Sequence, residues 1–401
     1  MTRQRFGAAS NGQLSRRRLL KELGTVAGIA SVARPAAARQ TQSPPGKPVD
    51  PPTTITNPPR DFGPGAPPTT YPDPDVLVVD PAFTRLRTFN SPIVRLWTGA
   101  LWSEGPAWNS QGQYLVWSDI PNNRQLRWLN DDGRVSVFQS PSNNSNGNTF
   151  DFQGRQISCE HLTRRVVRYE NDGSVTVIAD SYQGTHLIGP NDVAAHPDGS
   201  YWFTDLGAGG QLYEGTPDAA GGFSNKEGRL NPRLGQPPEI GTLRRELPSN
   251  VYRVDRSGKV DLMVSEKQMG GGSNGIAFSP DYKKLYLVRG GDLVSLDVGT
   301  DNTLTNQKQF LTMTIDGVRC ATDGIRCDVY GNLWCSSNAG RNVGYSGVTV
   351  WNPEGQLIGR IRLPEVCANV AFGGPERNRL FMAASQSLYA VYLNTQGAAP
   401  G

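Results

Sequence analysis

The stretch SNGIAFSPDYKKLYLVRG, from Ser273 to Gly290, is one of six related units in this chain of 401 residues. It begins with a small residue and an asparagine, continues with an apolar run, turns at Pro-Asp, and ends in a second run of aliphatic and aromatic side chains. Two such runs joined by a turn are typical of a β-hairpin. The six units begin at Ser103, Ser145, Pro190, Ser273, Thr322 and Ala368.

The spacing of these units indicates the fold. Successive units begin 42, 45, 83, 49 and 46 residues apart, and the longest interval contains a Gly- and Pro-rich stretch that we interpret as an inserted loop, residues 206–248. Each unit continues into a further pair of short strands, and four strands recurring every 40 to 50 residues or so are the signature of a propeller blade. The sequence therefore predicts an all-β fold, a six-bladed β-propeller. A pair of β-sandwiches would not repeat one polar residue at one position.

The second residue of every unit is polar and carries a side-chain oxygen. Because the inner strands of a propeller line its central channel, we expect these side chains to face one another in a ring. Hard divalent cations prefer oxygen ligands, and Ca²⁺ tolerates irregular geometry best, with Zn²⁺, Mn²⁺ and Mg²⁺ as alternatives. The other interpretation is that these residues only cap turns at strand starts. The six are Glu104, Asn146, Asn191, Asn274, Asp323 and Asn369.

The segment Gly271–Gly275 also fits the G-x-S-x-G pattern of serine hydrolases, with Ser273 in the place of the nucleophile. That pattern works at a tight turn between a strand and a helix. A hairpin follows it in this chain, so we expect Ser273 to be a small residue of the repeat and not a nucleophile.

Residues 1–38 resemble a twin-arginine export signal. SRRRLLK (Ser15 to Lys21) precedes a short apolar stretch and Ala36-Ala37-Ala38 offers a cleavage site, so we expect a protein exported to the periplasm. A basic, disordered tail is the alternative interpretation. Neither the apolar stretch nor any later one has the roughly 20 residues that a membrane-spanning helix needs.

Residues 39–75 contain 12 prolines among 37 residues and are predicted to form a linker before a folded domain at 76–401. The net charge of +4 comes from the basic first 38 residues, since the remainder carries −2. Without a basic stripe, nucleic acid is not an expected partner. The five cysteines show no zinc spacing; we expect buried thiols with at most one or two disulfides, Cys327 with Cys335 being possible. The sequence leaves the oligomeric state open.

Five motifs in order resemble the regucalcin, gluconolactonase and luciferin-regenerating-enzyme family of six-bladed propellers, over residues 76–395. They are SEGPAW, GPNDVAAHPDGSYWFTD, SNGIAFS, TDGIRCDVYGNLW and NVAFGG. NGNTFDFQGRQISCEHLTRRVVRYE is similar to the bacterial gluconolactonase branch in particular. The resemblance implies a lactonase that carries a divalent cation.

The resemblance also implies roles for individual residues. It makes Glu104 and Asn274 metal ligands, Asp323 a ligand and the general base, and Asn191 a contact to metal or substrate. One position departs from the pattern: some members of the family have Arg where this chain has Gly189, which puts the substrate contact made there in doubt.

The chemistry expected is lactone hydrolysis, with the cation polarising the carbonyl and water attacking it. A metal-bound carboxylate is a weak base, so a second proton acceptor is expected among the residues that return to the same rim, and His161 is our candidate. The rim also brings Asp119 and Glu160 near the channel. As substrate-binding residues we predict Asn146, Asn191, Asp205 and His186. The alternatives are hydrolysis of another ester or a phosphotriester on the same site, and a non-catalytic calcium-bound propeller that binds a sugar or a protein.

Overall fold

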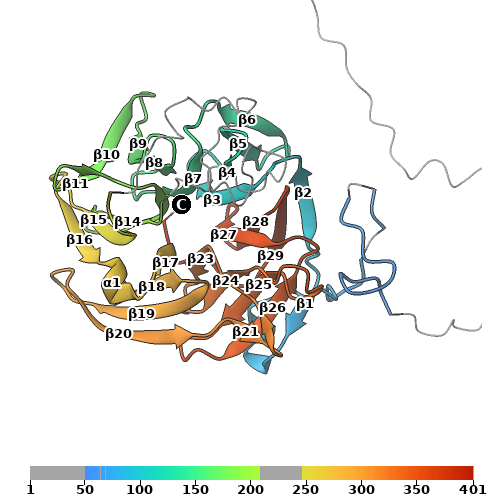
Figure 1. The fold of residues 1–401 in the computed structure, drawn as a ribbon. Coiled ribbons are helices and arrows are strands. Elements are labelled where there is room, and N and C mark those ends of the chain that lie inside the picture. Colours follow the sequence, from blue (N-terminus) through green and yellow to red (C-terminus); the bar gives the residue numbers. More distant parts are fainter. Residues whose placement is uncertain (1–49, 64, 68, 208–245, 401) are drawn as a thin grey trace, which may run out of the picture. The chain divides into compact units, whose positions relative to one another are not determined.

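The computed structural model describes residues 50–63, 65–67, 69–207 and 246–400. Within these residues, six antiparallel sheets surround a central axis like blades (Figure 1). Five blades have four strands in chain order from the axis outward, and one of these carries β1 as a fifth, outermost strand. The last blade has three strands in chain order and takes its fourth, β2, from the beginning of the folded chain. The predicted six-bladed β-propeller is confirmed.

The six blades follow one another along the chain. Blade one consists of β3 (Ser103–Asn109), β4 (Tyr114–Asp119), β5 (Arg124–Leu129) and β6 (Val135–Gln139). Blade two consists of β7 (Ser145–Phe150), β8 (Gln156–Glu160), β9 (Arg165–Tyr169) and β10 (Val175–Ala179). Blade three consists of β13 (Pro190–Ala195), β14 (Tyr201–Asp205), β15 (Asn250–Val254) and β16 (Val260–Val264). Blade four consists of β17 (Ser273–Phe278), β18 (Lys284–Arg289), β19 (Asp292–Val298) and β20 (Leu304–Leu311). Blade five consists of β23 (Ile325–Cys327), β24 (Leu333–Ser337), β25 (Gly347–Trp351), β26 (Leu357–Arg362) and β1 (Val76–Val78). Blade six consists of β27 (Cys367–Gly373), β28 (Arg379–Ala384), β29 (Ser387–Tyr392) and β2 (Val94–Thr98).

Short elements connect the blades. They are the 3-10 helix η1 (Pro81–Arg85), the helix α1 (Glu266–Met269), and the hairpins β11 (Ser181–Tyr182) with β12 (Thr185–His186) and β21 (Thr314–Ile315) with β22 (Val318–Arg319). None of the described helices is long and apolar enough to span a membrane.

The last blade joins the two ends of the folded chain. Its outermost strand is β2, which pairs antiparallel with β29 from Val94 opposite Ala390 to Thr98 opposite Ser387. The inner strands β27 and β3 of the last and first blades are also in contact. The backbone hydrogen bonds of β2 therefore close the ring.

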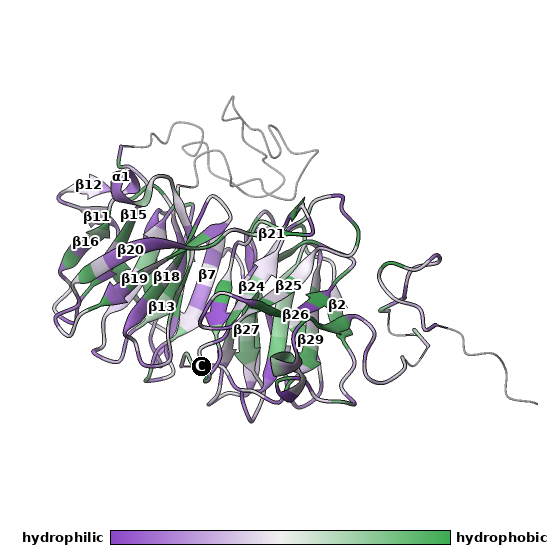
Figure 2. Cartoon of the chain, turned by 90° about the horizontal axis from the view of Figure 1, so that it is seen from below, coloured by the Kyte–Doolittle hydropathy of each residue, from purple (hydrophilic) through white to green (hydrophobic). Residues whose placement is uncertain are grey.

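Large aromatic side chains fill the spaces between blades. Trp108 stacks on Phe381, with ring centroids 5.8 Å apart, and Trp202 meets Phe278 edge-on at 5.4 Å. In Figure 2, the outer strands β2 and β29 are green, whereas the inner strand β7 is mostly purple. The apolar core thus lies within and between the sheets, and a polar strand surface is left for the axis.

The second half of the predicted linker packs on the propeller. Residues from Asp50 onward belong to the same compact unit as the blades. The buried Asp75 carboxylate accepts from the Arg362 Nε at 2.9 Å and the Thr54 amide at 3.1 Å, and Arg60 contacts it at 3.3 Å. The ring of Phe62 meets Tyr389 at 5.8 Å. The predicted export signal and most of the inserted loop lie outside the described residues.

All five cysteines are buried and free. The register of β23 and β24 sets Cys335 opposite Ile325 and Cys327 opposite Leu333, so Cys327 and Cys335 are not direct cross-strand partners. Burial raises the pKa of the Cys327 thiol well above its ordinary value, which keeps it protonated and unreactive.

Replacing Asp75 with Ala should lower the free energy of unfolding by about 3 kcal/mol, because the Arg362 guanidinium, 11% exposed, would lose its carboxylate partner. Urea unfolding followed by tryptophan fluorescence measures this. The control is Asp132→Ala, whose carboxylate is 51% exposed and 3.8 Å from Arg134, and we expect a loss below about 1 kcal/mol there. If Asp75→Ala and Asp132→Ala lost the same unfolding free energy, residues 50–75 would not stabilise the propeller through Asp75.

Candidate active site

The six inner strands begin at the same end of the channel, which we call the upper mouth. The ring residues lie at these strand starts: Glu104, Asn146, Asn191 and Asn274 are second in their strands, Asn369 is third in β27, and Asp323 lies two residues before β23. Each inner strand contacts the next around the axis. The six residues of the predicted ring therefore lie near the starts of six inner strands that are neighbours around the axis.

Neighbouring members of the ring approach closely because glycine follows four of them. A Cβ atom on Gly105 would lie only 2.0 Å from the carbonyl oxygen of Asn146, and one on Gly275 only 2.1 Å from that of Asp323. Any larger residue would push the inner strands apart. Glycine at these positions lets backbones of adjacent blades meet at the axis.

Glu104 is buried within the ring. Its Oε2 accepts from the Gly105 amide at 2.7 Å and from Asn369 Nδ2 at 3.1 Å. Burial raises the pKa of Glu104 well above its ordinary value, and the negative charge of Asp323 raises it further. The two carboxylates therefore come from blades one and five to share one poorly solvated space.

The ring fits a hard divalent cation. Asn274 Oδ1 is buried and has no hydrogen-bond partner among the described residues, which costs about 1–3 kcal/mol unless something else binds it. With Glu104 and Asp323, it offers three oxygens of the kind that Ca²⁺ prefers. In the part of the chain that the structure describes, no three His, Cys, Asp or Glu side chains are grouped so as to hold a metal. The predicted metal ligands include two carboxylates, Glu104 and Asp323, and the other two ligands are the asparagines Asn191 and Asn274.

Asn274 and Asp323 also line a hollow at the upper mouth. Its volume is about 630 Å³, and its wall includes Trp102, Arg289 and Asn338. The hollow is large enough for a monosaccharide, and it brings a solvent-accessible space to the ring.

His161 follows β8 and is buried beside the ring. Its Nε2 lies 3.3 Å from Asn146 Nδ2, while its Nδ1 is buried without a hydrogen-bond partner in the described residues. Burial lowers the pKa of His161 to about 4. The imidazole is therefore neutral at pH 7 and a weaker base than an ordinary histidine.

Two other predicted residues occupy different surroundings. The buried Asp205 carboxylate accepts from the amides of Ile188 at 3.0 Å and Gly189 at 2.7 Å, and so holds the loop that enters β13. His186 is exposed at the end of β12. Neither is among the described residues that line the hollow. Ser273 begins β17, which pairs with β18 as a hairpin, as expected for a residue of the repeat.

Residues 102–386 match the family described as the SMP-30/Gluconolactonase/LRE-like region. The chain belongs to this family.

Individual relatives agree with this membership. A gluconolactonase from Zymomonas mobilis subsp. mobilis is 26% identical over 342 residues, which cover 79% of this chain and 85% of that protein. The solved structure of a gluconolactonase from Xanthomonas campestris is 29% identical, with a TM-score of 0.64, covering 82% of this chain and 99% of the other. Regucalcin from Agrobacterium tumefaciens, a calcium-binding protein, is 18% identical with a TM-score of 0.56, covering 75% and 94%, a likeness of fold alone.

The backbone explains why this member of the SMP-30/Gluconolactonase/LRE-like family has glycine at position 189. Gly189 has a φ of 143°, in the region that side chains disfavour. Its amide also donates to Asp205. An arginine there would strain this turn.

Sequence reasoning missed an ion pair between two inner strands. Arg326 on β23 contacts Asp192 on β13 at 3.2 Å, and their side chains are 12% and 2% exposed. These strands belong to blades five and three, so the pair links two inner strands that are separated by the inner strand of blade four. The only signal in the sequence is that Asp192 follows its ring residue where four other units have glycine.

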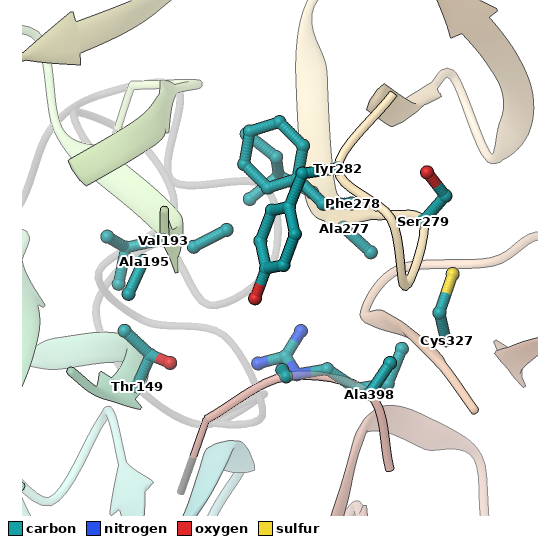
Figure 3. A pocket seen from close by; sticks show the side chains of 13 residues that line it. Thr149, Val193, Ala195, Ala277, Phe278, Ser279, Tyr282, Cys327 and Ala398 are labelled. Atoms are coloured by element: carbon teal, nitrogen blue, oxygen red, sulfur yellow. The ribbon is translucent and has the colours of Figure 1, made fainter. Parts of the chain in front are cut away.

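The lower mouth is covered by the end of the chain. The amide of Ala398 donates to the Cys327 carbonyl at 3.0 Å, and that of Val329 to the Gln396 carbonyl at 2.9 Å. Figure 1 marks the C-terminal end near the axis. Figure 3 shows Tyr282 pointing into a small pocket between Thr149 and Ala398. Among the described residues, the C-terminal segment therefore covers the lower mouth, at the end of the channel opposite the ring residues.

The free energy of unfolding should fall by up to about 3 kcal/mol as the pH drops from 6.5 to 4, owing to His161 alone. The unfolded chain binds the proton at its ordinary pKa of 6.5, whereas the folded chain binds it only near 4, so acid favours unfolding. His161→Gln should lose this component in urea unfolding at pH 7 and pH 4.5. The control, His186→Gln, replaces an exposed imidazole. If the unfolding free energy of His161→Gln depended on pH as strongly as that of the unmodified protein, the result would contradict the burial of a neutral His161.

Proposed function

We propose that this chain is a lactonase that hydrolyses a sugar lactone, such as gluconolactone, to the aldonic acid with the help of Ca²⁺. The observation that carries the proposal is the pair of carboxylates, Glu104 and Asp323, that share a buried ring with the unpartnered oxygen of Asn274. The relatives from Zymomonas and Xanthomonas, both gluconolactonases, support the reaction. The cation would be held by Glu104, Asn274, Asp323 and Asn191.

A bound Ca²⁺ would offset the negative charge that develops on the lactone carbonyl oxygen during attack by water. The chain's own residues then have two tasks. Asn146 and Asn191 offer amide groups to the hydroxyls of the sugar. Asp323 lines the hollow and is the first candidate to take the proton of the attacking water, and His161 is the second because its neutral ring contacts Asn146.

The surroundings of the ring favour catalysis. The Arg326–Asp192 pair and the C-terminal segment lie on the side of the channel away from the hollow. Of the residues that the structure describes, these cover the lower side of the channel, and the hollow lies on the upper side. Limited solvation strengthens the electrostatic interactions within the ring.

Glu104→Gln should remove both Ca²⁺ binding and turnover, because it replaces one of two carboxylates with a neutral amide of the same size. Hydrolysis of a panel of aldonolactones and aryl esters, with and without a chelator, measures turnover, and calorimetry measures Ca²⁺ binding. We expect the chelator to abolish hydrolysis and Ca²⁺ to restore it, with a loss of at least about 100-fold in the variant.

The matched control is Glu170→Gln, an acid between β9 and β10 that pairs with Arg168 at 2.6 Å, away from the channel. It should leave turnover unchanged. Turnover retained by Glu104→Gln would refute the proposed site. Hydrolysis of aryl esters or phosphotriesters without lactones would indicate a different esterase, and Ca²⁺ binding without hydrolysis would indicate a binding protein.

We also propose that the protein is exported to the periplasm by the twin-arginine route, on the strength of Ser15–Lys21. Changing Arg16 and Arg17 together to Lys keeps the charge and removes the arginine pair. Cell fractionation should then find the protein in the cytoplasm. Unchanged periplasmic recovery would contradict the signal.

A further inference from the structure

One residue of the upper rim differs in charge from its equivalents. In four consecutive blades the last residue of the second strand lies opposite the first residue of the inner strand. These cross-strand pairs are Asp119 with Ser103, Glu160 with Ser145, Asp205 with Pro190 and Arg289 with Ser273. The first three blades therefore carry an acid where the fourth carries a guanidinium.

The three acids are bound by their own blades. Asp119 accepts from the Leu101 amide at 2.9 Å and pairs with Arg124 at 2.9 Å. Glu160 pairs with Arg165 at 2.6 Å. Asp205 accepts backbone amides, as described above. These carboxylates support the loops of the rim, and none lines the hollow among the described residues.

Arg289 has a different set of contacts. Its Nη1 donates to the Met269 carbonyl at 3.0 Å and its Nη2 to Gln309 Oε1. The nearby Asp292 carboxylate is engaged by Arg319 and by the Met313 amide. Within the described chain, no carboxylate pairs with Arg289, and several of its five N–H groups remain available.

Arg289 also lines the same hollow as Asn274 and Asp323. Its stem lies along the glycines that lead into β17, since a Cβ atom on Gly271 would be 3.7 Å from Arg289 Cγ. Among the described residues, the hollow is therefore lined by the ring residues Asn274 and Asp323 and by the Arg289 guanidinium, which pairs with no carboxylate. The Asp292 carboxylate on the same wall is paired with Arg319. Planar guanidinium groups bind carboxylates through two parallel hydrogen bonds.

We propose that Arg289 determines specificity by binding a carboxylate on the substrate, so that the preferred substrate is an acidic sugar lactone and not a neutral one. This inference rests on the proposed lactonase activity. The lactone carbonyl lies at the ring, and the carboxylate at the far end of the sugar lies on Arg289. Arg289 then makes a contact to the substrate in place of the arginine that some members of the family have at the position of Gly189.

The experiment compares two lactones that differ only at C6. Glucono-1,4-lactone carries a hydroxymethyl group there, and glucaro-1,4-lactone carries a carboxylate. We expect the Ca²⁺-loaded protein to hydrolyse the acidic lactone with a kcat/KM at least about 10-fold higher, because a charge-assisted hydrogen bond contributes that much or more.

Arg289→Met should lower kcat/KM for the acidic lactone about 10- to 100-fold, mainly through KM, and leave the neutral lactone within about threefold. Arg289→Lys should restore part of the difference, since it keeps the charge without the planar fork. The control is Arg134→Met in the first blade, whose guanidinium is 75% exposed, lies 3.8 Å from Asp132 and does not line the hollow. It should change neither lactone.

The outcomes separate this inference from the proposed function. Turnover of the neutral lactone with no preference for the acidic one overturns the role of Arg289 alone. Equal losses on both lactones in Arg289→Met, with unchanged thermal unfolding, also overturn it and indicate a structural role. Turnover of neither lactone by the unmodified protein overturns the lactonase and the inference together.

Discussion

Two like charges, Glu104 and Asp323, are held in one buried space at the axis of the propeller, and the rest of the site follows from that constraint. Burial and mutual repulsion both raise the pKa of Glu104. A folded chain keeps such an arrangement only if something offsets it, and Asn274 adds an unpartnered oxygen to the same space. The ring thus holds an unfavourable interaction that a hard cation, if bound there, would relieve.

The same constraint limits which residues can follow the ring positions in the backbone. Oxygens from different blades can converge only if the inner strands meet at the axis, and this requires glycine after the ring residue at Gly105 and Gly275. In blade three an aspartate takes that place, and its charge is met by Arg326 from blade five. Packing between blades, through pairs such as Trp108 and Phe381, holds the strands at this distance.

The sequence was sufficient for the fold and the ring because both depend on a repeat. Each unit places its polar residue at the same point of an inner strand, so six local patterns predict one shared position. It was insufficient wherever partners come from unrelated parts of the chain. Nothing near Asp75 indicates that it binds Arg362, and nothing near Arg326 indicates Asp192. Asp205 shows the same limit, since its residue type suggested a substrate contact while its carboxylate accepts backbone amides.

The closure of the ring by β2 also bears on how the chain reaches its folded state. Thr98, at the end of β2, contacts Gln386 at a separation of 288 residues. During synthesis β2 therefore emerges long before β29, and non-local pairings of this kind fold slowly. Until β29 arrives, β2 has an exposed edge with unpaired amides and carbonyls, which is a template for wrong pairing with another chain. Aggregation in this protein should therefore begin from chains whose last blade is incomplete.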